Sequence, residues 1–371
     1  MQVEFGWYIP AAGDGRYLCT RQPERLPTHE YLTQVARAAE YAGFDSVLVP
    51  VAFSNGNYSI WAPRMDAWTV GTAALLATRR LQVIIAHRPG FINPAVFAQM
   101  ATTLDEMAQG RLALNIVTAG SPGDMEQYGD YLDHDARYHR AEEFVHLLKL
   151  LWTQPTTTYN GVYYRMQSAR LEPKPVQPAG PQFYLAGASE AALRMAGQQA
   201  DVYMMSADTV DQVARRVADV REHTPAGRTV RFCVAGTVFC RETEEAARAW
   251  AHEFVEHADL EVLAERKAAG RQTQSVEDVR FRAGTNVDTW LSPTLWSGMS
   301  HLAYGAAWVG SYETLADLFV QYVQAGISVF QLYGYPFLEE AYQVGENFMP
   351  VVKQQLARQG LLELRPVAAA S

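Results

Sequence analysis

Cysteine is scarce in this 371-residue chain, which has three: Cys19, Cys233 and Cys240. An odd number of cysteines without the close pairs typical of metal sites argues against a disulfide framework and favours a reducing compartment. Long apolar runs are also missing, and the first residues resemble a β-strand rather than a signal peptide. We therefore expect a cytoplasmic protein that does not enter a membrane.

Clustered basic charge is missing as well. The chain has 31 Lys and Arg against 40 Asp and Glu, a formal net charge of -9, and its basic residues are scattered. A general nucleic-acid surface needs basic residues gathered on one face, so the sequence favours a small-molecule role. The glycines at 13, 15, 120 and 123 do not match a dinucleotide fingerprint, and residues 133–139 lack a three-ligand metal pattern. We expect no resident metal.

Strand-like and helix-like segments do alternate along most of the chain. Amphipathic or capped helical segments separate the apolar runs, as between Asn93-Pro94 and Gly110. Such alternation indicates parallel βα units with right-handed crossovers, and we predict an α/β fold of the (β/α)₈ TIM-barrel type. The eight predicted strands are residues 3–10, 46–51, 81–85, 112–117, 182–185, 202–205, 230–239 and 329–332.

Two segments interrupt this rhythm. Asn160-Gly161 is a hairpin signal, so we predict a β-hairpin inserted near residues 156–166. A second insertion covers about 243–300, and residues 361–371 read as a flexible tail. The predicted organisation is one barrel domain over residues 1–360.

The stretch 111–138 carries the densest functional signal. A strand with a polar Asn115 inside it runs into a glycine-rich loop, and Arg137-Tyr138 follow before the next helix. Barrels place their ligands at the carboxyl ends of the strands, where this loop falls. The alternative is that Asn115 makes only a structural hydrogen bond, as buried polar groups normally do.

Several motifs together resemble a known family. They are Trp7 to Pro10 with Gly13-Asp14-Gly15, Gly110-Arg111 with 115–118, Asp133-His134 with Arg137-Tyr138, and Gly334-Tyr335-Pro336 with 338–346. The chain thereby resembles the luciferase-like flavin-dependent monooxygenases, in the branch of the alkanesulfonate, dimethylsulfone and pyrimidine monooxygenases. The resemblance extends from residue 3 to about residue 350 and implies a bacterial luciferase-like barrel.

The resemblance also implies a site for FMN. Asn115 would face the flavin ring, with Val51 and Ala52 beside it, and Arg137 and Tyr138 would reach the flavin tail or phosphate. Asp124 fits an acidic position of the pyrimidine-oxygenase type. Gly187 and Ser189 lie in a small-residue turn before a helix, where the family binds the flavin phosphate. Ser189 alone would otherwise be read as an ordinary helix N-cap.

For catalysis, Tyr335 matches an active-site tyrosine of the family. We expect His87 and Arg88, at the end of the third strand, to form a charged pair over the barrel mouth, with a rim ion pair of Arg88 as the alternative. Arg282 belongs to segment 270–296, which also holds Arg271, Arg280, Trp290 and Trp296. Loops longer than about 15 residues are usually functional or disordered, so we predict a lid whose arginines meet an anionic or polar substrate, the alternative being a solvated surface loop.

The expected reaction is monooxygenation by reduced FMN and O2 through a flavin peroxide, with the FMN reduced by a separate NAD(P)H:FMN reductase. Ala235 and Thr237 stand where the alkanesulfonate enzymes carry an Arg and a His, and Ala12 replaces a family His. The first choice of substrate is still an organosulfur compound, sulfonate or sulfone. A C–N, amide or heterocyclic substrate, a deazaflavin-dependent oxidoreductase and a non-catalytic flavin-binding protein are the alternatives. We also expect a homo-oligomer, dimer or tetramer.

Overall fold

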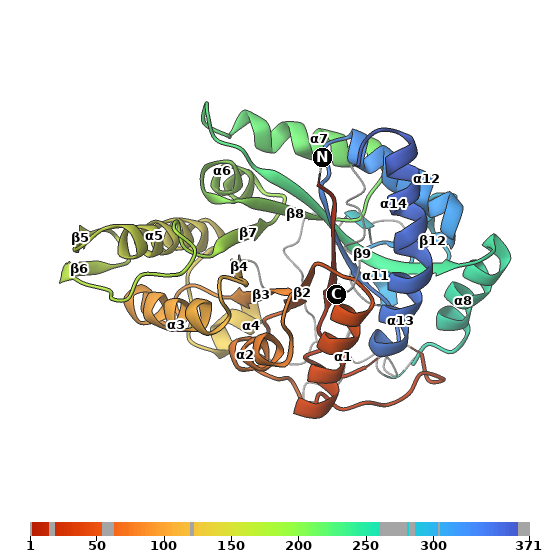
Figure 1. The fold of residues 1–371 in the computed structure, drawn as a ribbon, viewed down its shortest axis with the longest axis horizontal. Helices are drawn as coiled ribbons and strands as arrows, with labels where there is room; N and C mark the ends of the chain where they lie inside the picture. Colours follow the sequence, from red (N-terminus) through yellow and green to blue (C-terminus); the bar gives the residue numbers. More distant parts are fainter. Residues whose placement is uncertain are drawn as a thin grey trace, which may run out of the picture.

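Eight parallel strands close into a barrel in the computed structural model (Figure 1), which describes residues 2–14, 19–53, 63–118, 122–259, 261, 280–281, 286–302 and 305–362. Each strand pairs with the next along the chain, and the last pairs with the first. The predicted TIM barrel is therefore confirmed. The strands are β1 (Glu4–Tyr8), β2 (Ser46–Val49), β3 (Gln82–His87), β4 (Leu112–Ile116), β7 (Gln182–Ala186), β8 (Val202–Ser206), β9 (Arg231–Arg241) and β13 (Val329–Tyr333).

Helices cover the outside of this barrel. Side chains on the outer face of the strands pack with the helices in one continuous hydrophobic cluster, and a second cluster fills the barrel interior. The barrel strands are buried on both faces of the sheet, as expected for a parallel sheet. The covering helices are α1 (His29–Tyr41), α2 (Ala67–Ala77), α3 (Pro94–Met107), α5 (His134–Thr153), α6 (Glu190–Gln199), α7 (Val210–Glu222), α12 (Tyr312–Gln324), α13 (Phe337–Gln343) and α14 (Met349–Arg358). None of the described helices combines the length and apolarity needed to cross a bilayer.

Side-chain caps fix where several helices begin. Asn93 Oδ1 accepts the Ala95 N–H at 2.9 Å ahead of Pro94, as the sequence predicts for α3. Asp133 Oδ1 accepts the Ala136 N–H at 2.8 Å, so α5 begins at His134 and not at His139 as predicted. This earlier start brings Arg137 and Tyr138 into the first turns of α5.

The seventh barrel strand, β9, is longer than predicted and reaches Arg241. Residues 231–235 pair with β8, whereas residues 237–241 pair with β12 (Ala307–Ser311), a strand that the sequence reading missed. β12 covers the strand edge that β9 would otherwise expose beyond the barrel. An antiparallel pair, β10 (Trp290–Ser292) and β11 (Leu295–Trp296), extends this edge within the segment that we expected to be irregular.

Shorter elements fill the connections. α4 (Pro122–Gln127) occupies part of the glycine-rich loop, and α8 (Glu244–Glu256) and α11 (Met299–Leu302) belong to the second insertion. The predicted last helix is divided by a π-helical turn, Val344–Phe348, just ahead of Pro350. Proline cannot donate a backbone hydrogen bond, which accounts for the local change of helix type.

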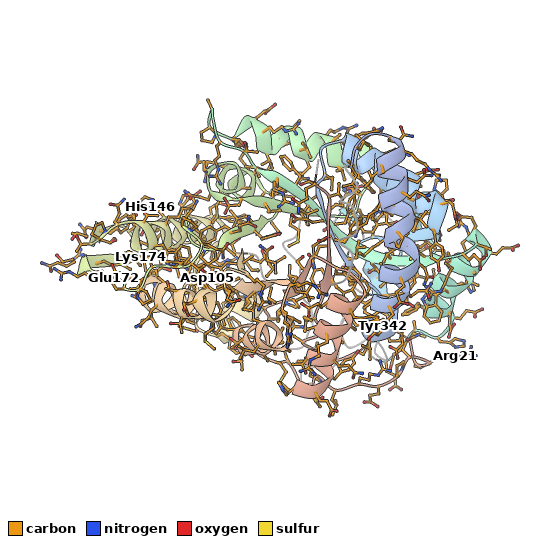
Figure 2. All side chains as sticks on the ribbon, viewed as in Figure 1. Arg21, Asp105, His146, Glu172, Lys174 and Tyr342 are labelled. Carbon is orange, nitrogen blue, oxygen red and sulfur yellow. The ribbon has the colours of Figure 1, made fainter. Side chains whose placement is uncertain are left out.

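A two-stranded hairpin, β5 (Thr157–Asn160) and β6 (Arg165–Ala169), projects with α5 at the left of Figure 1. The Glu143 carboxylate of α5 accepts the N–H groups of Val162, Tyr163 and Tyr164 at 2.8–3.3 Å. Asp105 of α3, labelled in Figure 2, accepts the Gln177 N–H at 3.1 Å in the loop that returns to β7. Buried or half-buried carboxylates therefore hold the connecting segments against the helices.

Candidate functional site

The carboxyl ends of the strands form the barrel mouth. The interior cluster contains Leu48, Ile84, Met204 and Cys233, and side chains alternate along each strand. The next inward positions toward the mouth are therefore Tyr8, Ala86, Asn115, Ser206, Ala235 and Tyr333. Tyr8 and Ala235 pack against the interior cluster directly. The mouth combines small side chains, two tyrosines and one amide.

Asn115 is the polar centre of this layer. Its side chain is 6 % exposed, and within the described residues its Oδ1 atom has no hydrogen-bond partner. A buried acceptor without a partner costs about 1–3 kcal/mol, so it calls for a donor that the folded chain does not supply. Within the described residues, this oxygen does not make the structural hydrogen bond that was the alternative to a ligand contact.

The turn after β7 forms a second polar position. Gly187 has φ +117°, and its carbonyl accepts a hydrogen bond from the Tyr203 hydroxyl at 2.7 Å. A Cβ at Gly187 would lie 2.6 Å from Tyr138 Oη, so the tyrosine of α5 and the turn meet here. Only glycine fits this conformation and this contact.

Ser189 follows as the N-cap of α6. Its Oγ accepts the Ala192 N–H at 3.3 Å, which leaves the hydroxyl hydrogen to donate to a ligand. The amino end of α6 and the Tyr138 hydroxyl thus converge beside Gly187, with donors suited to an anion. Arg137 is 4 % exposed, and its Nη1 donates to the Leu132 carbonyl at 2.8 Å.

Val51 and Ala52, half-buried, directly follow β2 at the mouth. Arg64 Nη2 donates to the Pro50 carbonyl next to them at 3.0 Å. The side chain of Asp124, in α4, lies outside the described residues, and so does Arg282.

His87 corrects a sequence-based expectation. Its ring stacks on Phe97 of α3 at 3.9 Å between centroids and on Phe144 of α5 at 5.3 Å, so it points into the helix layer and not over the mouth. Burial lowers the pKa of His87 to about 3. Side chains alternate along β3, so Ala86 points into the barrel and His87 points outward. The prediction did not take this alternation into account. His87 is therefore a neutral core residue and not half of a charged pair.

Arg88 and Tyr335 lie among aromatic and sulfur groups. The Arg88 guanidinium lies 5.6 Å from the Phe53 ring centroid, and its Nη1 is 2.9 Å from Met125 Sδ. Tyr335 is 4 % exposed and contacts the Phe337 ring at 5.1 Å between centroids. Its ring is also 6.2 Å from that of Tyr333 at the mouth.

The predicted lid is described only in part. Arg280 forms an ion pair with Asp208, which follows β8, and the Phe281 side chain is buried in the main core cluster. Arg271, like Arg282, lies outside the described residues, and Trp290 and Trp296 belong to β10 and β11. Arg280 is thus engaged by a carboxylate of the barrel, and the lid itself stays a prediction.

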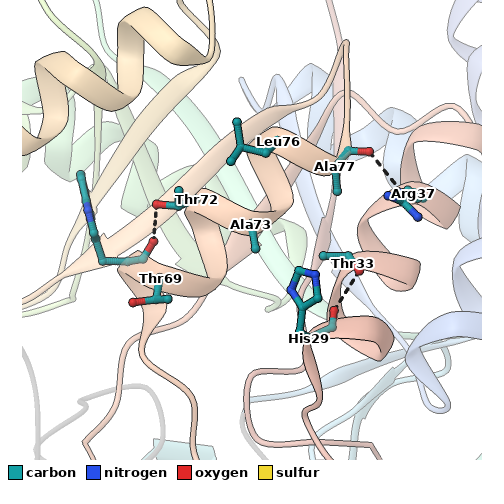
Figure 3. Close-up of a pocket in the computed structure, with 9 residues that line it drawn as sticks. His29, Thr33, Arg37, Thr69, Thr72, Ala73, Leu76 and Ala77 are labelled. Atoms are coloured by element: carbon teal, nitrogen blue, oxygen red, sulfur yellow. Dashed lines mark hydrogen bonds between the residues drawn. The ribbon is translucent and has the colours of Figure 1, made fainter.

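A separate groove lies on the outside of the barrel between α1 and α2, with a volume of about 490 Å³ (Figure 3). His29, Arg37, Trp68 and Leu76 are among its lining residues, and Arg37 Nε donates to the Ala77 carbonyl at 3.4 Å. None of the predicted site residues lines this groove. The groove is therefore not part of the predicted flavin site.

Comparison with known proteins identifies the family. The family model described as luciferase-like monooxygenase matches residues 3–328. The chain belongs to the luciferase-like monooxygenase family. It is accordingly an enzyme of the flavin-dependent monooxygenase class.

Solved structures show the same fold. A long-chain alkane monooxygenase (LadA) has 19 % identity and a TM-score of 0.78, covering 98 % of this chain and 93 % of that one. The EDTA monooxygenase of Chelativorans sp. BNC1 has 16 % identity and a TM-score of 0.78, covering 96 % and 94 %. Riboflavin lyase (RcaE), solved with modified FMN and riboflavin, has 20 % identity and a TM-score of 0.77, covering 98 % and 93 %.

The residues of this luciferase-like chain fit a flavin mononucleotide. The Asn115 oxygen lacks a donor among the described residues, which a flavin ring N–H would supply, and the Gly187 turn is a cradle that a Cβ would fill. One tyrosine that the sequence reading did not single out belongs to this neighbourhood: Tyr203, which fixes the Gly187 carbonyl. The alternation of side chains along β8 could have indicated which way it points.

We predict that two substitutions separate the ends of the flavin. Ser189→Ala should weaken FMN binding by roughly 1 kcal/mol, about fivefold in Kd, but leave binding of riboflavin, which lacks the phosphate, unchanged. Asn115→Ala should weaken both ligands because it acts at the ring. Ser189→Asp keeps the N-cap but repels phosphate, so it should weaken FMN alone and more strongly. Fluorescence titration measures all three; wild-type affinities in Ser189→Asp would contradict the phosphate assignment.

A second prediction concerns the buried His87. Below pH 6.5, the ordinary pKa of histidine, His87 is protonated in the unfolded chain, whereas in the folded chain it stays neutral down to about pH 3. The free energy of unfolding therefore falls as the pH falls through this window. Between pH 7.5 and pH 5 this contributes a loss of about 2 kcal/mol. His87→Phe should lack that loss in urea unfolding at the two pH values. An equal pH dependence in both proteins would show that His87 is not buried in its neutral form.

Proposed function

We propose that this chain is the oxygenase of a two-component system. Reduced FMN would come from a separate NAD(P)H:FMN reductase through transient contact, since the sequence carries no nicotinamide fingerprint. The observation that supports FMN most directly is the pairing of an anion cradle at Gly187 and Ser189 with the unsatisfied Asn115 oxygen. We also place the enzyme in the cytoplasm, in line with its three unpaired cysteines.

The cofactor and the protein have different tasks. Reduced FMN, when bound, would supply the two electrons with which O2 gives one oxygen atom to the substrate and the other to water. Ser189, Tyr138 and the amino end of α6 would hold the phosphate, and Asn115 would orient the ring. Tyr335 and its aromatic neighbours exclude water from the reacting atoms. Val51 and Ala52, at the end of β2, would lie beside the ring.

The substrate is a small polar organic molecule, with an organosulfur compound, sulfonate or sulfone, as first choice. The overall resemblance of the sequence to the alkanesulfonate and dimethylsulfone monooxygenases supports this choice. The alternative is a C–N, amide or heterocyclic substrate, which Ala235 and Thr237 favour because they remove the charge that the alkanesulfonate enzymes carry there. Either substrate uses the same flavin site.

Coupled turnover tests this proposal. The protein with an FMN reductase and NADH should convert one substrate among alkanesulfonates, dimethylsulfone and uracil, with one O2 consumed per product and no product when FMN is omitted. Flavin oxidation that yields only hydrogen peroxide with every compound would contradict the oxygenase assignment. Activity with a reduced deazaflavin, and none with reduced FMN, would favour the alternative oxidoreductase.

We also propose a homodimer formed through α2 and α3. α2 carries no charged residue, and Leu76 on it is 60 % exposed, while Val96 and Met107 of α3 are exposed as well. Trp68 and Phe97 bring the two helices into contact at 5.0 Å between ring centroids. The absence of charge on α2 lets two copies of a net negative chain approach along this helix, and a two-fold axis would place it against itself.

Light scattering tests the dimer. The wild-type protein should have twice the mass of the 41.3 kDa chain, and Leu76→Lys should shift it toward the monomer because each copy would bury a lysine. Leu291→Lys, at an exposed leucine on β10, is the matched control. A monomeric wild type, or a dimer that Leu76→Lys leaves intact, would contradict this interface.

A further inference from the structure

Two tyrosines face each other on one side of the barrel mouth. β1 and β13 run parallel with Trp7 opposite Leu332, so Tyr8 and Tyr333 occupy the next position on the inward face. Their rings lie 5.0 Å apart between centroids at 72°, an edge-to-face contact that holds the Tyr8 ring in one orientation. Neither residue was part of the predicted flavin site.

Within the described residues, the Tyr8 hydroxyl has only a weak hydrogen-bond acceptor. It donates to Met204 Sδ at 4.0 Å, and a thioether is a poor acceptor that a substrate oxygen can replace. Burial, with the neighbouring Tyr333 and Cys233, raises the pKa of Tyr8 well above its usual value. The hydroxyl therefore keeps its proton and stays a donor.

A second hydroxyl lies on the same side. Thr237 pairs in register with Tyr333 across β9 and β13, and its side chain is fully buried. Within the described residues its Oγ1 atom has no hydrogen-bond partner. Two hydroxyl groups with weak or missing protein partners thus adjoin the mouth, which is the pattern of a site built to recognise an oxygen acceptor.

The inward layer around them is uncharged. Where the structure describes the strand ends, the inward side chains are Tyr8, Ala86, Asn115, Ala186, Ser206, Ala235, Thr237 and Tyr333. Arg280 is paired with Asp208, and Arg64 donates to a backbone carbonyl. Arg88, just beyond β3, contacts the Phe53 ring and Met125 Sδ. An anion placed against these inward side chains would lose its hydration without meeting a charged group among them, which is strongly unfavourable.

We infer that Tyr8 is a specificity-determining residue that donates a hydrogen bond to an uncharged sulfonyl or carbonyl oxygen of the substrate, with Tyr333 positioning its ring. The substrate class is then a small neutral sulfone or amide, and sulfonate anions are rejected. This inference rests on the proposed flavin-dependent oxygenase function and narrows it.

A matched pair of probes tests the inference. Dimethylsulfone and methanesulfonate are close in size and differ in charge, and uracil adds a neutral carbonyl compound. In coupled turnover the better neutral probe should exceed methanesulfonate at least 100-fold in kcat/KM. Tyr8→Phe should raise KM for the neutral probe about tenfold or more, with kcat changed much less. Tyr131→Phe, at an exposed tyrosine, should change neither value.

FMN titration of the same variants distinguishes a failure of the proposed flavin site from a failure of the proposed substrate contact of Tyr8. Tyr8→Phe and Tyr333→Leu should bind FMN as the wild type does, because neither touches the phosphate cradle. A wild-type protein that binds no FMN would overturn the proposed function itself. If FMN binds normally, then equal turnover of the sulfonate, no turnover of either neutral probe, or an unchanged KM in Tyr8→Phe would overturn the inference and leave the flavin site standing.

Discussion

Closure of the parallel barrel is the constraint on which the rest of the structure depends. β9 pairs with β8 along residues 231–235 and with β13 along residues 233–237, and these two ladders join the ends of the strand series. Closure fixes which residues point inward, because side chains alternate strictly along each strand. It therefore decides that Asn115 and Tyr8 face the ligand side, whereas His87 packs outside against Phe97 and Phe144.

The mouth separates two kinds of binding chemistry. One side, at Gly187, Ser189 and the amino end of α6, offers donors suited to a phosphate. The opposite side, at Tyr8 and Tyr333, offers hydroxyl and ring surfaces without charge. A phosphate bound at the first side would keep its negative charge at the rim, away from the uncharged side chains of Tyr8 and Tyr333.

Much of the fold could be predicted from the sequence because local signals agreed with the global pattern. Apolar strands, the Asn93-Pro94 start of α3 and the Ser189 turn each specify their element from neighbouring residues alone. β12 was missed because its strand character depends on the long β9 edge beside it, which is a tertiary feature. The start of α5 was placed too late because the cap of Asp133 was overlooked.

The candidate site was harder to predict than the fold. Residues beside glycine turns, such as Ser189, and polar residues inside apolar strands, such as Asn115, stand out in the sequence. Tyr8 does not stand out, because an aromatic residue at a strand end is usually core, and only the barrel register shows that it meets Tyr333. His87 shows the reverse error: a polar residue at a strand end was assigned to the mouth without regard to strand parity.

A crystal structure of the protein with FMN tests the central claim most directly. We expect the phosphate within hydrogen-bond distance of Ser189 Oγ and Tyr138 Oη, and the flavin ring beside Asn115 with its edge N–H or carbonyl meeting the side-chain amide. FMN bound elsewhere, for example in the groove between α1 and α2, or a ring that leaves Asn115 without contact, would contradict it.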